Sequence, residues 1–252
     1  MGISLKSKKS LFITPYIFKE FPEIVAAIST RNGNDTPPYF FNLSYKVGDD
    51  YNRVSENRKI FFSTLGIEEE KIVFQKQIHS DICNFVTSPG FIPNSDALYT
   101  NCNNLYLTVT VADCLPILIY SPETKVVGAV HAGWRGTLRK ILFKTVLTIK
   151  NHFNINLKEL RVYIGPGISV KNFEVGYEVA KEFPKEYIIH NNEKFFVDLK
   201  KYNFDQLIES GVSGEHIEIS PLCTFDEIQL CHSYRRDKKY SGRMIALIGR
   251  RF

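Results

Sequence analysis

The stretch from Thr108 to Phe153 limits the possible folds of this chain most strongly. Residues 115–120 and 126–130 are almost continuously apolar, which is typical of strands covered on both faces. Residues 105–111 alternate between apolar and polar side chains, which predicts a strand with one buried face. From Thr137 onward the apolar side chains follow helical spacing, at Leu138, Ile141, Leu142, Val146 and Ile149. The stretch therefore predicts a layered sheet with a helix packed against it.

Further strands and helices are interspersed along the chain without a strict βαβ rhythm. Apolar runs predict strands at 24–28, 72–79, 160–164, 195–198 and 244–248, and helical spacing predicts helices at 54–65, 174–183 and around 204–208. No repeat, linker or low-complexity segment interrupts this pattern. We therefore expect an α+β fold class, with mixed β-sheets packed together and flanking helices, in a single domain over residues 1–252.

The composition excludes several classes of protein. A chain that is 44% hydrophobic and 23% charged is not disordered, and no apolar run of about 18 residues could span a membrane. The net charge of +5 comes without a dense basic block, so we expect neither nucleic acid nor membrane as a partner. Five cysteines, an odd number, do not predict a disulfide framework, and no signal peptide is visible. We expect a cytoplasmic protein, of undetermined oligomeric state.

Three residues with metal-ligand or nucleophile chemistry each end a predicted strand. They are His79, Cys114 and His131, and the strand at 72–79 places Gln77 on the same face as His79. Three such ligands far apart in sequence resemble a catalytic zinc site with one open position. A metal-free Cys–His nucleophile pair and ordinary core residues explain the same residue types. Spacing alone leaves these alternatives open.

Several charged residues near these positions have two possible roles. Arg135, Arg139 and Lys140 lie around a predicted helix start with Thr137 as the N-cap, where the helix dipole favours an anion. We expect either a bound anion there or basic side chains that extend into solvent. Arg235 could similarly bind an anion or be solvated. Asp113, beside Cys114, could orient a ligand, act as an acid or base, or cap a strand end.

Four motifs carry a family resemblance. They are Gln77-Ile78-His79, Ala112-Asp113-Cys114-Leu115-Pro116, His131-Ala132-Gly133-Trp134-Arg135-Gly136-Thr137, and Ser233-Tyr234-Arg235-Arg236-Asp237 followed by Gly242-Arg243-Met244. Together they resemble the YfiH-type family, whose members are also described as laccase-domain proteins, polyphenol oxidases or peptidoglycan editing factors. The resemblance runs from about residue 24 to the end. One departure is Gly167, where many members carry a cysteine.

The resemblance implies a fold, a metal and an activity. The fold would be a mixed α/β arrangement shared distantly with bacterial toxin deamidases that use a Cys–His pair. His79, Cys114 and His131 would bind zinc and act in catalysis. The activity would be purine nucleoside phosphorolysis of adenosine, inosine and methylthioadenosine, with adenosine deamination. Nucleoside and phosphate would contact Gln77, Asp113, Arg135 and Arg235, and Arg31 and Arg58 would be further candidates for binding the phosphate.

The family is also labelled laccase, but the residues of this chain favour zinc over copper. A multicopper oxidase cluster needs about ten histidines as ligands. This chain has six. Three functional alternatives to the phosphorylase remain open at this point. They are a metal-free Cys–His hydrolase or amidase acting on peptidoglycan precursors, a polyphenol oxidoreductase, and a non-catalytic partner-binding protein.

Overall fold

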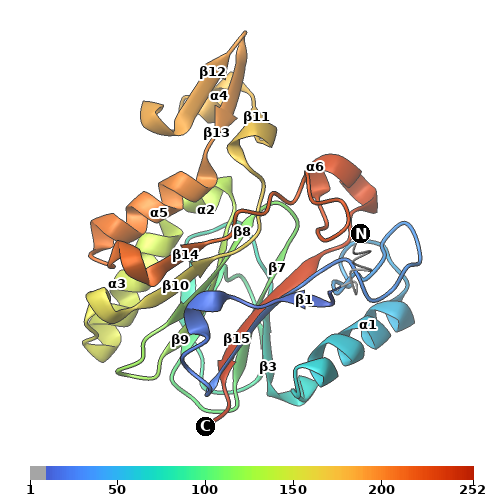
Figure 1. The fold of residues 1–252 in the computed structure, drawn as a ribbon, viewed down its shortest axis with the longest axis vertical. Helices are drawn as coiled ribbons and strands as arrows, with labels where there is room; N and C mark the ends of the chain where they lie inside the picture. Colours follow the sequence, from blue (N-terminus) through green and yellow to red (C-terminus); the bar gives the residue numbers. More distant parts are fainter. Residues whose placement is uncertain (1–9) are drawn as a thin grey trace, which may run out of the picture.

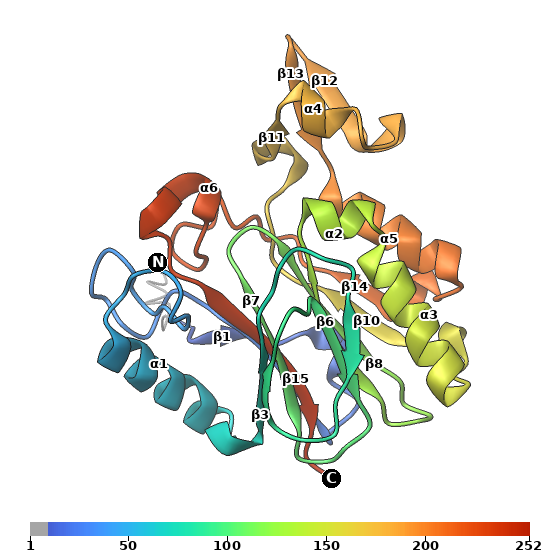
Figure 2. The same ribbon diagram turned by 180° about the vertical axis from the view of Figure 1, so that it is seen from behind.

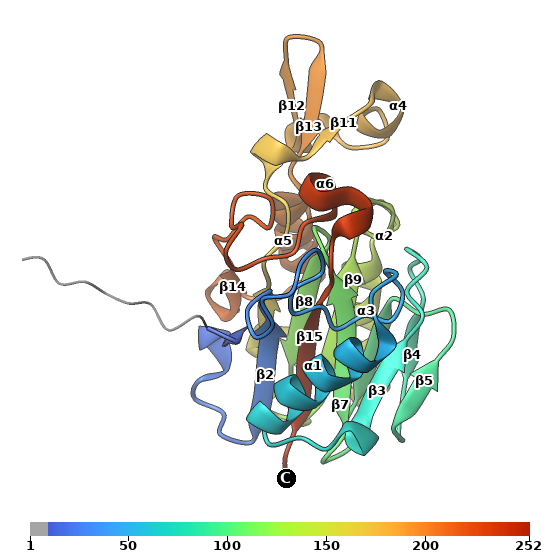
Figure 3. The same ribbon diagram turned by 90° about the vertical axis from the view of Figure 1, so that its right-hand side faces the viewer.

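The computed structural model describes residues 10–252, whose main elements stack in four layers (Figure 1). Two six-stranded sheets pack face to face. Helix α1 (Tyr51–Thr64) covers the outer side of the first sheet, while α3 (Ile141–Phe153) and α5 (Leu199–Ser210) cover the outer side of the second. Figure 3 shows α1 lying across the first sheet. The predicted α+β class of packed mixed sheets is confirmed.

Both large sheets mix parallel and antiparallel neighbours. The first has the order β1 (Phe12–Ile13), β2 (Ile24–Ser29), β15 (Met244–Arg250), β7 (Tyr106–Val111), β3 (Ile72–Gln75) and β5 (Gly90–Ile92). The second has the order β14 (Ile217–Ile219), β10 (Arg161–Ile164), β8 (Leu115–Tyr120), β9 (Val127–Ala132), β6 (Ala97–Thr100) and β4 (Cys83–Phe85). The long antiparallel pairs β15–β2, β15–β7 and β8–β9 form the centres of the sheets.

A third, small sheet projects from one end of the layered body (Figures 1 and 2). It has the order β11 (Glu174–Val175), β13 (Lys194–Val197) and β12 (Ile188–Asn191), with the short helix α4 (Tyr177–Ala180) beside it. The predicted helix at 174–183 is therefore wrong in extent. Gly176 has an extended backbone that separates β11 from α4, and periodicity over so short a segment did not reveal the break.

Short helical turns connect these elements. The 3₁₀ turns are η1 (Tyr16–Phe18), η2 (Glu69–Lys71), η3 (Leu157–Glu159), η4 (Val170–Asn172), η5 (Lys185–Tyr187), η6 (Gly214–His216) and η7 (Lys238–Tyr240). Within residues 10–252, no helix has the length and apolar character needed to cross a membrane.

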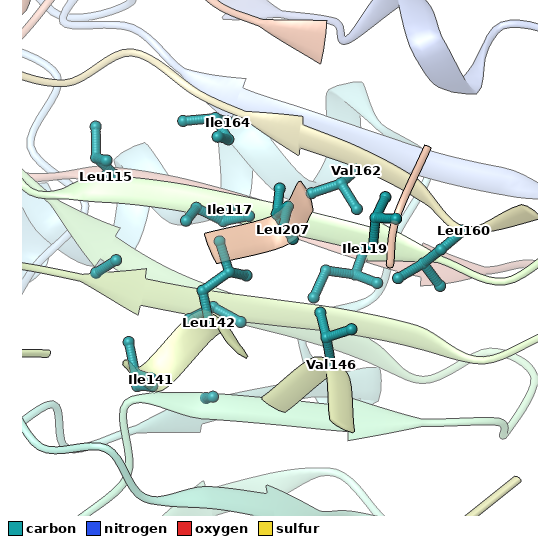
Figure 4. Packing of buried hydrophobic residues seen from close by; sticks show 14 of the residues in the cluster. Leu115, Ile117, Ile119, Ile141, Leu142, Val146, Leu160, Val162, Ile164 and Leu207 are labelled. Carbon is teal, nitrogen blue, oxygen red and sulfur yellow. The ribbon is translucent and has the colours of Figure 1, made fainter. Parts of the chain in front are cut away.

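Strand β8 shows why the central apolar run is nearly continuous. Its residues Leu115, Ile117 and Ile119 face α3 and α5, as Figure 4 shows, while Leu118 and Tyr120 face the first sheet. All five side chains are fully buried. Each such side chain contributes about 1.5–3 kcal/mol relative to an exposed one. The prediction of a strand covered on both faces is confirmed.

Strand β7 differs from its prediction in one respect. Leu107 and Val109 point between the sheets as the alternation predicted. The opposite face is also buried, because Tyr106 packs in the cluster under α1 and Thr108 donates a hydrogen bond to the Val73 carbonyl at 2.8 Å. The expectation of one buried face is wrong, since polar residues on a strand can be covered when a further layer supplies partners.

The predicted helix start at Thr137 is also wrong. A short helix α2 (Trp134–Leu138) comes first, and α3 begins only after Lys140, whose φ is +59°. Thr137 is fully buried inside α2, where its Oγ1 accepts from Asn203 Nδ2 at 2.9 Å. Its carbonyl accepts from Gln206 Nε2 at 3.0 Å. Thr137 therefore attaches α2 to α5 instead of capping a helix.

Candidate metal centre

His79, Cys114 and His131 converge from three separate segments. His79 follows β3 in a loop, Cys114 lies in the turn between β7 and β8, and His131 lies in β9. Their ligand atoms all lie within 4.8 Å of one another, and Cys114 Sγ is 4.0 Å from His79 Nε2. Tetrahedral zinc holds nitrogen and sulfur ligands about 3.5 Å apart, so a small contraction would bring these donors into range. The three side chains could therefore hold a metal ion.

Asp96 organises this centre, and the sequence interpretation missed it. Its fully buried carboxylate accepts from His131 Nδ1 at 2.8 Å, from the backbone N–H groups of Ile78, His79 and Ser80 at 2.7–3.1 Å, and from the Ser80 hydroxyl at 2.7 Å. A carboxylate bonded to one ring nitrogen fixes the tautomer and orientation of a metal-binding histidine. Asp96 therefore leaves Nε2 of His131 for the centre. The pair Asp96-Ala97 lies in a short polar turn and fits the family pattern, but the sequence interpretation assigned the aspartate no role in the site.

The electrostatics of the centre favour ionised groups. Burial alone would raise the pKa of Asp96, but hydrogen bonds from His131 and Ser80 outweigh burial and lower that pKa to about 2. Burial would likewise raise the pKa of Cys114, yet the imidazoles of His131 and His79 lower it. Burial disfavours the charge on His131, while the Cys114 thiolate and Asp96 raise its pKa. Cys114 is thus prepared to serve as a thiolate, the form that binds metals and acts as a nucleophile.

Gly133 allows the ligands to come together. A Cβ atom on Gly133 would lie 2.9 Å from His79 Cδ2 and 3.0 Å from Cys114 Sγ. Both distances are too short for an ordinary contact, so any larger residue would displace two of the three ligands. Glycine, which has no Cβ, permits this close approach of the backbone.

Two non-glycine residues at the centre adopt the left-handed backbone region. The φ of His79 is +58° and that of Asp113 is +90°. Such conformations cost free energy and occur where surrounding contacts enforce them, often at functional sites. Asp113 is held by three contacts: its carboxylate accepts from Thr224 Oγ1 at 2.7 Å and from the Arg235 N–H at 2.6 Å, and its carbonyl accepts from the Ile168 N–H at 2.9 Å. Both carboxylate oxygens have protein partners, which favours an orienting role for Asp113 over substrate contact.

Gln77 also has protein partners for its side chain. Its Nε2 donates to the Thr110 carbonyl at 2.8 Å, and its Oε1 accepts from the Thr110 N–H at 2.7 Å and hydroxyl at 2.8 Å. These contacts attach the loop that carries His79 to strand β7. They favour a positioning role for Gln77.

The basic residues predicted at one helix start are distributed among different contacts. The guanidinium of exposed Arg135 stacks on Trp134 at 4.1 Å. Lys140 pairs with Glu209 at 3.1 Å. Arg139 is the member directed to the centre, since its Nη1 donates to the His79 carbonyl at 3.4 Å. The expectation of a common cationic helix start is therefore wrong.

Arg235 and Arg243 approach the centre from the C-terminal segment around α6 (Tyr234–Asp237). Arg235 Nη1 donates to the Glu174 carbonyl at 2.7 Å, which links α6 to the projecting sheet. Burial lowers the pKa of Arg243, and the charges of Asp113 and Cys114 oppose that effect. Arg243 is therefore a partly buried cation beside the centre. The sequence interpretation did not single it out, although its Gly-Arg-Met motif was visible.

Comparisons with known proteins identify the family of this chain. The profile of a family described as multi-copper polyphenol oxidoreductase laccase matches residues 25–251. A relative named purine nucleoside phosphorylase SSP1584, from Staphylococcus saprophyticus, is 31% identical over 260 residues, which cover 96% of this chain and 97% of the relative. A relative named purine nucleoside phosphorylase YlmD, from Geobacillus stearothermophilus, is 32% identical over 251 residues, which cover 92% of each chain.

Solved structures show the same fold over nearly the whole length. The crystal structure of YlmD from Geobacillus stearothermophilus matches with a TM-score of 0.89 and 31% identity, covering 96% of this chain and 99% of that one. The Bacillus licheniformis hypothetical protein YfiH matches with a TM-score of 0.87 and 30% identity, covering 92% and 94%. The resemblance of the sequence motifs is confirmed, and the chain belongs to the YfiH-type family described as multi-copper polyphenol oxidoreductase laccase.

Proposed function

We propose that this protein is a zinc-dependent purine nucleoside phosphorylase acting on adenosine, inosine and methylthioadenosine, with adenosine deaminase activity. The observation that carries the proposal is the convergence of His79, Cys114 and His131, with Asp96 behind His131. The names of the relatives support the phosphorylase part. Nucleoside and phosphate are then its partners. We place it in the cytoplasm, where its five free cysteines would stay reduced.

The donor set favours zinc over copper. Two imidazoles and one thiolate match a catalytic zinc site with three protein ligands. A laccase cluster needs many more imidazoles than the six histidines of the chain can supply. Bound at this centre, zinc would supply a Lewis acid with an open coordination position.

The residues of the chain would prepare the reactants. Asp96 keeps the proton of His131 on Nδ1, which directs the Nε2 lone pair to the centre. Arg139 and Arg243 contribute positive charge on the His79 side and the Cys114 side. In phosphorolysis, a phosphate oxygen bonds to C1′ of the ribose, the glycosidic C–N bond breaks, and the base leaves with its electron pair and takes up a proton. Fixed cations near the reacting groups stabilise the charge that develops in such a step.

Inosine and adenosine separate the two activities. Inosine lacks the amino group that deamination removes, so we expect hypoxanthine release from inosine only when phosphate is present. Adenosine should still be converted to inosine without phosphate. Cys114→Ser should lower zinc content and both activities by at least about tenfold, because a hydroxyl is a poor zinc ligand. Wild-type rates in metal-free Cys114→Ser would exclude metal chemistry at this centre.

A metal-free cysteine hydrolase or amidase is the second candidate. The observation in its favour is the lowered pKa of Cys114 beside His79 and His131. Such an enzyme would cleave an amide in a peptidoglycan precursor through a Cys114 acyl intermediate. Turnover of a muropeptide by metal-free protein, with inert nucleosides, would establish this candidate instead. Oxidation of a phenol by copper-loaded protein would support the polyphenol oxidoreductase alternative.

A further inference from the structure

A small cavity lies between α1 and the first sheet, where β3 separates from β7. The two strands pair only at Ile72–Tyr106 and Val73–Leu107. Beyond that point two glutamine side chains replace the backbone ladder, since Gln75 Nε2 donates to the Thr108 carbonyl at 3.1 Å and Gln77 bonds to Thr110. The gap forms a cavity of about 160 Å³.

Arg58 forms one wall of this cavity with its guanidinium between two aromatic rings. The ring centres of Tyr45 and Phe74 lie 4.3 and 4.4 Å from its Cζ. Its Nε donates to the Leu43 carbonyl at 2.9 Å, and Nη1 reaches Glu69 Oε1 only at 3.4 Å. Arg58 is 9% exposed. A guanidinium whose faces are covered by rings can bind a ligand through its edge, the geometry suited to oxyanions.

Gln75 lines the same cavity and carries a buried acceptor without a partner among residues 10–252. Its side chain is 7% exposed, and this acceptor is Oε1. The amide cannot simply be turned over, because Nε2 is needed to donate to the Thr108 carbonyl. A buried acceptor left open costs about 1–3 kcal/mol. The cavity therefore favours a ligand that brings a hydrogen-bond donor to this atom.

The other charges around the cavity are mainly positive. Lys46 lines it, with Nζ 5.7 Å from the centre of the Phe91 ring. Partial desolvation lowers the pKa of Lys46, although its side chain is exposed, and the nearby charge of Lys76 adds to that effect. Glu69 is the acidic group in contact with Arg58. Two lining cations with one weakly held carboxylate favour an anionic ligand.

Size decides which anion fits. Pockets for nucleosides and drug-sized ligands enclose about 300–1,000 Å³, so a cavity of about 160 Å³ is too small for a nucleoside. We propose that this cavity binds inorganic hydrogenphosphate, with its oxygens on Arg58 and Lys46 and its O–H donated to Gln75 Oε1. Sulfate and the dianion of a phosphate monoester have the same tetrahedral oxygens but no proton to donate.

The phosphate site extends the proposed function. Only the role of the bound phosphate as a co-substrate rests on that function. Phosphate bound in this cavity would serve as the co-substrate of the phosphorylase. The cavity lies next to the candidate metal centre in the chain, because Gln77 in its wall is two residues from His79. Binding itself can be measured without nucleoside. Protein that binds phosphate here but leaves inosine intact would overturn the proposed function and keep the site.

The experiment is calorimetric titration of the metal-loaded protein with phosphate, sulfate and methyl phosphate at pH 7.5. We expect wild type to prefer phosphate over both other anions by at least about tenfold, because only phosphate satisfies Gln75. Gln75→Leu should remove that preference. Arg58→Gln should weaken phosphate binding by at least about tenfold, as expected for loss of a charged hydrogen bond.

Lys46→Gln is the variant that tests the site without disturbing buried residues, because Lys46 is exposed at the cavity rim. It should weaken phosphate binding by a few-fold or more. Lys19→Gln is the matched control, since Lys19 also lies over an aromatic ring, Tyr16, but in another part of the fold. Wild-type phosphate affinity in folded Lys46→Gln and Gln75→Leu would overturn the proposal, as would equal affinity of wild type for phosphate and sulfate.

Discussion

The candidate metal centre and the proposed phosphate cavity are built in opposite ways. At the centre, the buried carboxylate of Asp96 accepts hydrogen bonds from five donors. In the cavity, the buried amide oxygen of Gln75 accepts none from residues 10–252. Satisfied polar networks make a region rigid, whereas an open buried acceptor is costly until a ligand supplies its partner. Substitutions at the centre should therefore reduce stability, and substitutions at the cavity should reduce ligand binding.

The largest effect is expected for Asp96→Asn. The asparagine amide has one oxygen and cannot accept all the hydrogen bonds that the carboxylate accepts. Its NH2 group would also lie opposite hydrogen-bond donors. We expect a loss of about 3 kcal/mol in the free energy of unfolding and of about 10–100-fold in zinc affinity. Denaturant unfolding and metal titration measure both. Asp81→Asn is the control, because Asp81 pairs with Lys144 at the surface, and it should lose less than about 1 kcal/mol. Equal losses in the two variants would contradict the special role of Asp96.

Gly133→Ala should have the next largest effect. Its new methyl group would press on His79 and Cys114, so we expect about 1–3 kcal/mol of destabilisation together with weaker zinc binding. Gly214→Ala provides the comparison, since its Cβ would meet Ile208 at an ordinary 3.6 Å. Unchanged zinc affinity in Gly133→Ala would show that the ligands have more room than the structure indicates.

His232, a buried histidine whose Nε2 has no partner among residues 10–252, should make the free energy of unfolding depend on pH. Burial, with the charges of nearby arginines, lowers its pKa to about 3. The folded state therefore keeps His232 neutral, while the unfolded chain binds a proton below about pH 6.5. Above about pH 6.5, keeping His232 neutral does not reduce the free energy of unfolding. Below that pH, the free energy of unfolding falls by about 1.4 kcal/mol per pH unit as the pH decreases toward 3.

Unfolding free energies at pH 7 and pH 5 measure this dependence. His232→Asn should lose less stability between these two pH values than wild type does. His190→Asn, which removes an exposed histidine stacked on Phe195, should keep the wild-type dependence. The same dependence in all three proteins would assign the acid sensitivity to other groups.

The smallest effect is expected for Arg135→Ala. Arg135 is exposed and stacks on Trp134, so its loss should cost less than about 1 kcal/mol. Phosphate affinity should stay within about two-fold of wild type, in contrast to Arg58→Gln. A tenfold loss of phosphate affinity in Arg135→Ala would show that phosphate binds at the start of α2 and not in the cavity.

Sequence patterns predicted the layers of the fold better than their details. Continuous apolar runs at 115–120 and 126–130 identified strands buried on both faces, because burial on two sides requires apolar residues at every position. The break between α2 and α3 was not predictable from periodicity. It depends on Lys140 adopting a left-handed backbone and on Thr137 bonding to α5, which lies more than 60 residues later.

The metal centre was expected from family motifs, since separations of 35 and 17 residues between its ligands match no local spacing rule. Asp96 was missed because an aspartate in a polar turn resembles an ordinary cap until its partners are known. Gln75 gave no signal at all. Its importance comes from the separation of β3 and β7, a property of the tertiary structure.

Arg235 connects the projecting sheet to the turn before Cys114. Arg235 donates its backbone N–H to Asp113 and its side chain to the Glu174 carbonyl at the base of the projection. The far end of the projection is a turn at residues 192–193, beyond the last pairing of β12 with β13. Extra residues are tolerated best at exposed loop tips with few contacts. Insertions should therefore be accepted at residues 192–193 and rejected next to Glu174, where a shift of one residue would move the turn that carries Cys114.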